Sequence, residues 1–144
     1  MTRGPRHGER GSMTLELAVL APALLLLVGL LIIGGRVAIA TGSVEAAARD
    51  AARTASIART PAQARSDATS TATTTLTAQG LQCSTTTVDV STAGFAVPVG
   101  QPAQVSARVT CQVALADLVL PGLPGTRAVT GAATSPLDTF RERG

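Results

Sequence analysis

The sequence predicts an α+β protein in which a long N-terminal transmembrane helix precedes a small antiparallel β-sheet domain. Three observations lead to this fold class. Residues 17–35 carry no charged side chain, the segment that follows is rich in alanine and arginine, and apolar and polar residues alternate in much of the chain beyond residue 83. Long apolar runs are typical of membrane helices, whereas a period of two is typical of half-buried strands.

The composition of the chain limits which residues can form the core and which classes of partner it can bind. The chain of 144 residues has no tryptophan or tyrosine, so its core must be built mainly from valine, leucine and alanine. A small core of this kind needs additional stabilisation, such as a cross-link or contact with neighbouring subunits. All 12 basic residues are arginines, the net charge is +3, and no aromatic residues interleave with them. We therefore expect no nucleic-acid partner.

Residues 17–35 form the first element, a helix that crosses the membrane. At about 1.5 Å per residue this run is roughly 28 Å long, close to the ~30 Å hydrocarbon core of a bilayer. Arg3, Arg6, His7 and Arg10 precede the run, against one acid, Glu9. The positive-inside rule then predicts a single-pass cell-membrane protein with a cytoplasmic N-terminus and with residues 37–144 outside. The apolar helix would be in contact with membrane lipid.

Three interpretations compete for this segment. As a secretory signal peptide, it would be cut after Ala40, at the small-residue site Ala38-Ile39-Ala40, and would release a secreted binding domain. The run is longer than usual for such a signal, and Glu16 stands where basic residues are expected. As a plain anchor, the segment would stay uncut, which explains its length and orientation but not the glutamate.

The third interpretation uses Gly11 and Glu16 together. Gly11 ends a short basic leader, and Glu16 is the fifth residue after it. This arrangement resembles the class III signal of type IV pilins and pseudopilins, which a membrane-embedded prepilin peptidase cuts after the glycine. The resemblance implies that the leader, residues 1–11, is removed in the cytoplasm and that Ser12 becomes the N-terminus of a protein that keeps its apolar helix.

Cleavage would also explain the position of Glu16. A charge near hydrocarbon is costly unless it has a partner. When such helices bundle, Glu16 of one subunit could meet the new Ser12 amine of its neighbour, which would neutralise both charges and set the axial register. The first helical turn also favours an anion. The alternative is a carboxylate at the membrane interface that faces water.

We expect the assembly helix to cover residues 12–58, so that it continues outside the bilayer. Alanine and arginine favour helix, and Glu45 and Arg49 form an i,i+4 pair in the favoured order. Small residues recur every four positions, which lets helices approach closely, although alanine is also simply frequent in this chain. One row contains Gly34, Ala38 and Gly42, and a second contains Ala47, Ala51 and Ala55.

Residues 59–144 form the predicted extracytoplasmic α+β domain. Thr60, Pro61 and Gln63 have the pattern of a helix start, and this second helix should run to about Thr77. Strands are expected within 85–92, 95–102 and 103–115, with an edge strand within 126–140.

The cysteines, Cys83 and Cys111, fall in this domain. Cys111 shares the apolar face of the strand at 103–115, and Cys83 lies just before the preceding strand. An even number of cysteines beyond a membrane segment indicates a disulfide, and the alternative is two reduced thiols. With His7 outside the folded part, two isolated cysteines are too few for a zinc site, so we expect no metal or cofactor.

Several motifs together resemble the TadE-like proteins of the tight-adherence (Flp) pilus system. They are the opening at Gly11 to Glu16, the membrane-embedded pattern of Ala18, Pro22, Leu24, Leu25 and Gly29, and the sequence AARDAAR at 47–53. The resemblance implies a minor pseudopilin that is processed by the prepilin peptidase. It would contact other pilin or pseudopilin subunits and act in pilus assembly, in the membrane or within the fibre.

An enzyme is not expected. The sequence has no histidine after Gly11 and no nucleophile–base motif, and the aspartates of the predicted domain are far apart in the chain. We therefore expect no small-molecule substrate. The main alternative function is a secreted or membrane-anchored extracytoplasmic binding domain.

Overall fold

The computed structural model of the chain describes residues 10–118, 122 and 124–140, and the side chains of these residues from Leu17 on. Residues 1–9, which hold most of the predicted leader, lie outside the described part. The chain forms two compact units, Met1–Gly35 and Arg36–Gly144. The boundary falls inside one helix, so the second half of that helix belongs to the folded unit.

Helix α1, Arg10–Ile57, has 48 residues and corresponds to the long helix that the sequence predicted at 12–58. Pro22 lies inside it without ending it. Up to Gly35 its described side chains are largely exposed, whereas from Ala40 on one face is buried. The same helix therefore presents two different surfaces, one apolar and one amphipathic.

Helix α2, Pro61–Ala78, begins as predicted. The Thr60 hydroxyl accepts a hydrogen bond from the backbone N–H of Gln63 at 3.2 Å, and Pro61 occupies the first helical turn. Threonine is a poor helix former, yet several threonines of α2 donate their hydroxyl to the carbonyl four residues earlier. These bonds are made by Thr69, Thr73, Thr74 and Thr77.

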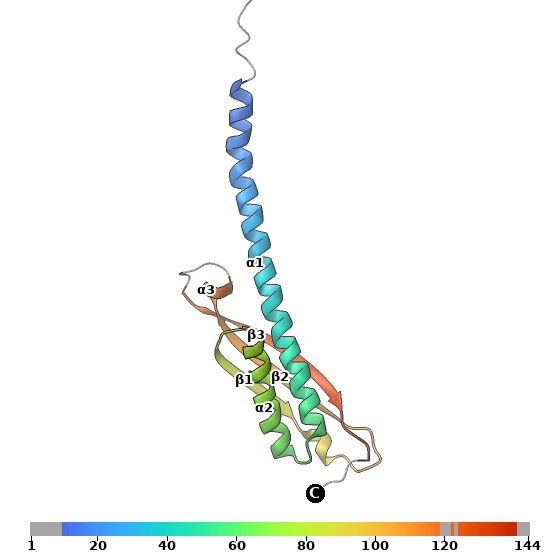
Figure 1. Ribbon diagram of the computed structural model, residues 1–144. Coiled ribbons are helices and arrows are strands. Elements are labelled where there is room, and N and C mark those ends of the chain that lie inside the picture. Colours follow the sequence, from blue (N-terminus) through green and yellow to red (C-terminus); the bar gives the residue numbers. More distant parts are fainter. Residues whose placement is uncertain (1–9, 119–121, 123, 141–144) are drawn as a thin grey trace, which may run out of the picture. The chain divides into compact units, whose positions relative to one another are not determined.

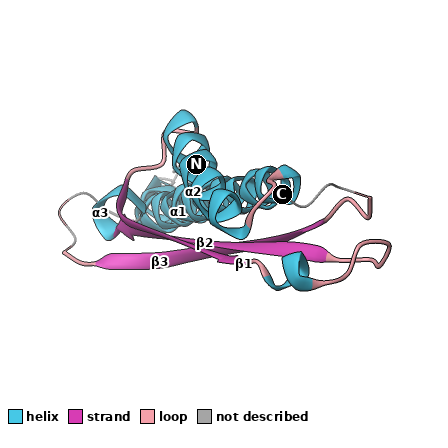
Figure 2. Cartoon of the chain, turned by 90° about the horizontal axis from the view of Figure 1, so that it is seen from below, coloured by secondary structure: helices cyan, strands magenta, loops and turns pink. Residues whose placement is uncertain are grey.

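A three-stranded antiparallel sheet completes the α+β fold, as predicted. Its strands are β1, Cys83–Ser91, β2, Gln104–Ala114, and β3, Thr126–Pro136, in the order β1-β2-β3. The second half of α1 and all of α2 lie on one face of the sheet (Figures 1 and 2). The alternation predicted for β2 is confirmed, because every second residue of this strand is buried.

The strand predicted within 95–102 is wrong. The segment instead holds a short 3-10 helix, η1, Ala93–Ala96. Gly94 lies so close to the Gln104 carbonyl that a Cβ would overlap it, and Phe95 turns into the core with 8% exposed. Pro98 lacks an N–H for a strand ladder. The apolar alternation therefore belongs to a connection that is tightly packed at Gly94 and Phe95 and exposed at 98–102. Leu115, expected at the end of a strand, begins helix α3, Leu115–Leu118.

The core depends on small residues between α1 and the sheet. Gly131 of β3 pairs with Val109 of β2 and faces α1. A Cβ at Gly131 would lie 2.8 Å from the Glu45 Cα and N and from the Val44 carbonyl oxygen. Apart from Val44, the buried side chains of α1 are all small: Ala40, Ser43, Ala47, Ala48, Ala51, Ala52, Ala55 and Ser56. The helix backbone therefore rests directly on the sheet.

Polar side chains join α1 to α2 along their antiparallel contact. Three hydrogen bonds connect the helices. As the α1 partner moves toward the C-terminus of α1, the α2 partner moves from the C-cap of α2 toward its N-terminus, and together the bonds fix the register of the two helices. The pairs are Ser43 with Gln79 at 3.0 Å, Asp50 with Thr75 at 3.1 Å, and Thr54 with Thr71 at 3.3 Å.

Replacing Gly131 by valine should destabilise the folded unit. The new side chain would meet helix backbone, which cannot move aside without separating α1 from β3. We expect a loss of about 1–3 kcal/mol in the free energy of unfolding, and a fall in Tm of roughly 5 °C or more, for the full chain in detergent. Ala132→Val, on the exposed face of the same strand, is the matched control. Equal Tm values for the two variants would contradict this account of the core.

Candidate membrane-anchor and assembly site

The first part of α1 is apolar on every side. From Leu17 to Ile32 its large side chains are exposed, with Leu25 and Leu26 at 74% and 76%. Exposing one such side chain to water costs about 1.5–3 kcal/mol, so an uncovered run of them is unfavourable in water. The helix is long and apolar enough to cross a membrane. This suggests a single-pass membrane protein, and its orientation stays a prediction from the arginines before the helix.

The proposed processing and charge-neutralisation residues lie in the first turns of α1. Gly11, Ser12 and Glu16 have helical backbone, while their side chains lie outside the described part. Ser12 and Glu16 are four positions apart in the sequence of this helix. The predicted cleavage bond, Gly11–Ser12, therefore falls within the helix, which begins at Arg10.

The two rows of small residues have different environments. Gly34, Ala38 and Gly42 are all exposed, and a Cβ at either glycine would meet no atom within 4 Å. The second row, in contrast, is fully buried in the domain core. Ala47, Ala51 and Ala55 are each 0% exposed. Both rows have the spacing that allows close packing, but only the first is open to another helix.

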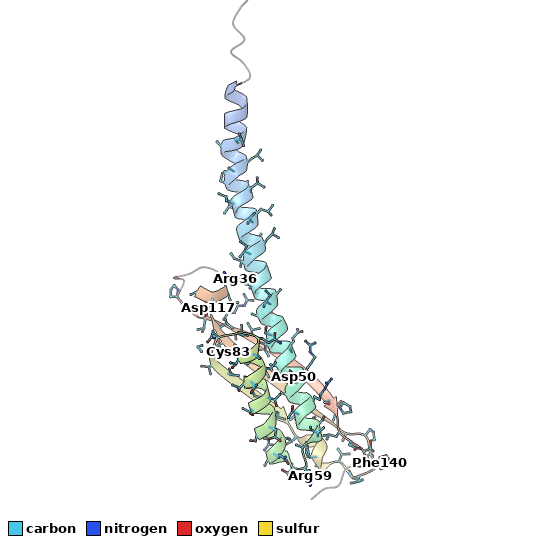
Figure 3. All side chains as sticks on the ribbon, viewed as in Figure 1. Arg36, Asp50, Arg59, Cys83, Asp117 and Phe140 are labelled. Atoms are coloured by element: carbon cyan, nitrogen blue, oxygen red, sulfur yellow. A yellow bond between two sulfur atoms is a disulfide. The ribbon has the colours of Figure 1, made fainter. Side chains whose placement is uncertain are left out.

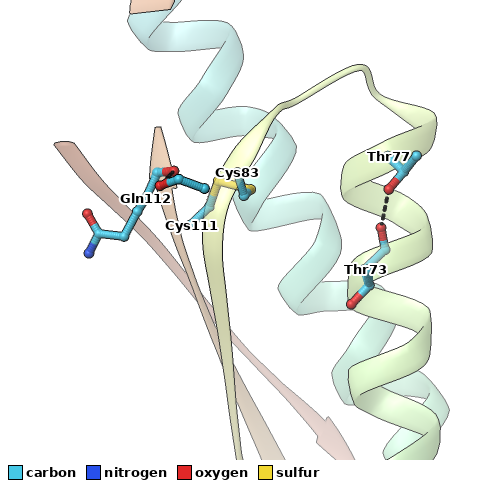
Figure 4. The surroundings of a disulfide bond; sticks show 6 residues. Thr73, Thr77, Cys83, Cys111 and Gln112 are labelled. Atoms are coloured by element: carbon cyan, nitrogen blue, oxygen red, sulfur yellow. Dashed lines mark hydrogen bonds between the residues drawn. A yellow bond between two sulfur atoms is a disulfide. The ribbon is translucent and has the colours of Figure 1, made fainter. Parts of the chain in front are cut away.

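Cys83 and Cys111 form the predicted disulfide, which links β1 to β2 (Figure 4). Their Cα atoms are 5.4 Å apart, and Cys111 is fully buried. The strand register shifts between Cys83 and Thr85, which places Cys83 opposite Val113. A cross-link between cysteines 28 positions apart contributes about 3–4 kcal/mol by restricting the unfolded chain.

The aspartates of the domain do not converge. Asp67 lies on α2, Asp89 on β1, Asp117 on α3 and Asp138 after β3. Among the described residues, no three of histidine, cysteine, aspartate and glutamate are placed to hold a metal ion. That the chain is not an enzyme stays a prediction from its sequence.

One polar contact was not foreseen from the sequence. Arg36 directly follows the apolar run and Asp117 lies in the domain beyond it, and no pattern in the sequence links the two. The Arg36 Nη1 donates a hydrogen bond to the backbone carbonyl of Asp117 at 3.3 Å, which joins α1 to α3 (Figure 3). The separation of 81 positions in the chain explains why no local pattern indicates the contact.

An apolar anchor helix that continues into a disulfide-linked α+β domain defines a membrane-anchored, single-pass class of protein. Residues 11–53 match the family model described as TadE-like protein. This confirms the predicted resemblance to the TadE-like proteins over that segment. The match covers most of α1 and none of the sheet. No curated protein and no solved structure gives a significant match to the chain.

The exposed row can be tested separately from the fold. Gly42→Leu should preserve or raise Tm, because its side chain meets open space and glycine costs a helix about 1 kcal/mol relative to a good helix former. The larger side chain should nevertheless prevent close helix approach and reduce cross-linking between full-length chains in membranes.

The matched control is Ala78→Leu, which adds the same side chain at an exposed position of α2. Unchanged cross-linking in Gly42→Leu, at wild-type expression, would show that the row takes no part in association.

Proposed function

We propose that the chain is a minor pseudopilin-type structural subunit that acts in assembly of a tight-adherence pilus after processing by a prepilin peptidase. The TadE-like match is the observation that carries the proposal, and it supports a role in the Tad pilus system. The match begins at Gly11, the proposed cleavage residue, and includes Glu16. The uninterrupted helix α1 is the element through which such a subunit would contact its neighbours.

Glu16 has a defined part in this proposal. After cleavage, its carboxylate would pair with the Ser12 amine of an adjacent subunit, so that neither charge stays unpaired near hydrocarbon. The pair forms at one axial offset of the two helices, and it therefore selects a register. The exposed row of Gly34, Ala38 and Gly42 would let those helices approach closely.

The structure favours this function over a secreted domain released after Ala40. Ala40 is only 2% exposed, and the bond after it lies in the middle of α1. A cut there would remove Arg36, with its hydrogen bond to Asp117, and would leave the buried face of α1 without its first residues. By contrast, a cut at Gly11 lies far from the domain core in sequence.

The Gly11–Ser12 bond must leave the helix before a peptidase can cut it, because proteases bind an extended backbone. Its place in the first turn makes this inexpensive, since helix ends fray and glycine is about 1 kcal/mol less favourable than alanine in a helix. This explains in physical terms why a glycine suits the position.

Mass spectrometry of the mature N-terminus tests the processing. We expect a protein that begins at Ser12 when the chain is expressed with its cognate peptidase, and an intact leader when the peptidase is omitted. A protein that begins at Thr41 would instead identify a secreted domain. An uncut chain in the presence of the active peptidase would identify a plain anchor.

Glu16→Ala tests charge neutralisation. Cleavage and membrane insertion should be retained, because neither needs this carboxylate, whereas co-assembly should be lost since the Ser12 amine has no partner. The measurement is the amount of subunit recovered with sheared pili and cross-linked to other subunits. Glu45→Ala is the control, because Glu45 is exposed and its 3.9 Å ion pair with Arg49 contributes little. Normal piliation in Glu16→Ala would refute the neutralisation mechanism.

A further inference from the structure

A groove of about 340 Å³ lies at the end of the folded unit that begins with Arg36. It is formed by α1, by the connection from α2 to β1, and by α3 with the end of β2. Apolar side chains line much of it, and Ile39 among them is 70% exposed. Ile39 therefore presents apolar surface to whatever occupies the groove.

The groove also holds one group of each charge. Arg36 and Asp117 both line it and are labelled in Figure 3. The recorded hydrogen bond from Arg36 goes to the backbone carbonyl of Asp117, and so it does not engage the Asp117 carboxylate. The Asp117 residue is exposed. The groove therefore has a guanidinium from Arg36 and a carboxylate from Asp117 in its lining, together with apolar side chains.

Chain connectivity places Arg36, one of the residues that line this groove, close to the membrane surface. Residues 17–35 carry no charge, and Arg36 is the first charged residue after them. If that run fills the hydrocarbon core, Arg36 lies at the level of the lipid phosphates, whatever the tilt of the domain. Every residue that lines the groove shares the folded unit with Arg36.

We propose that the groove binds the head group of a zwitterionic phospholipid that carries a primary amine. The guanidinium of Arg36 binds the phosphate, the carboxylate of Asp117 accepts hydrogen bonds from the ammonium, and the glycerol and first acyl carbons lie along Ile39 and Leu118. A choline head group offers no N–H to Asp117, and an anionic head group is repelled by it. The inference rests on the membrane anchor and not on the proposed role in pilus assembly.

Native mass spectrometry of the full chain in detergent micelles tests the lipid preference. Phosphatidylethanolamine, phosphatidylcholine and phosphatidylglycerol with the same acyl chains are added in turn. We expect phosphatidylethanolamine to be retained about two- to fivefold better than the other two, as a partly exposed charge pair allows. Asp117→Asn should remove the preference for ethanolamine over choline, and Arg36→Gln should weaken retention of all three lipids.

Asp138→Asn and Arg53→Gln are the matched controls, because each removes an exposed charge outside the groove. Equal retention of the three lipids, or an unchanged preference in Asp117→Asn, would overturn the proposal. Preferential retention of phosphatidylglycerol would overturn it in favour of a simple anion site. Release of the wild-type chain from membranes by carbonate washing would overturn the anchoring on which it rests, whereas a defect in piliation alone would bear only on the pilus role.

Discussion

The direct contact between the α1 backbone and β3 is the constraint on which the folded unit depends. At Gly131 the absence of a side chain lets the sheet approach Val44 and Glu45 of the helix, and alanines on either side keep the two surfaces close. An alanine core buries little apolar area per residue, so its stability relies on tight packing over a long interface. The long helix is therefore a requirement of the fold as well as a membrane anchor.

This requirement explains why the two halves of α1 have different surfaces. Before Arg36 the helix is apolar on every side, as a lipid environment demands, and beyond Ala40 it is small and apolar only on the face that meets the sheet. Gly42 lies on the open side, where an added Cβ would meet no packed neighbour within 4 Å. The alanine row at 47, 51 and 55 has the same spacing, yet its partner is the chain's own sheet and α2.

Features with a strong local cause could be predicted from the sequence. The length of α1 follows from its apolar run and alanines, the start of α2 from the Thr60 cap, and the burial of Cys111 from the period-two pattern of β2. The segment after Phe95 shows the limit, because Phe95 is buried while Val99 of the same alternating pattern is exposed, so the alternation does not mark a strand. The contacts of Gly131 and Arg36 join residues far apart in the chain, so no local pattern indicates them.

The disulfide connects the fold to the topology of the chain in the membrane. A domain without tryptophan or tyrosine gains about 3–4 kcal/mol from the Cys83–Cys111 link, a large share of the stability that a small domain has. Such a link persists only in an oxidising compartment. The arginines before the membrane run independently favour a cytoplasmic N-terminus, which places the cysteines outside. Two unrelated physical effects thus support one orientation, with the N-terminus in the cytoplasm and the disulfide-linked domain outside.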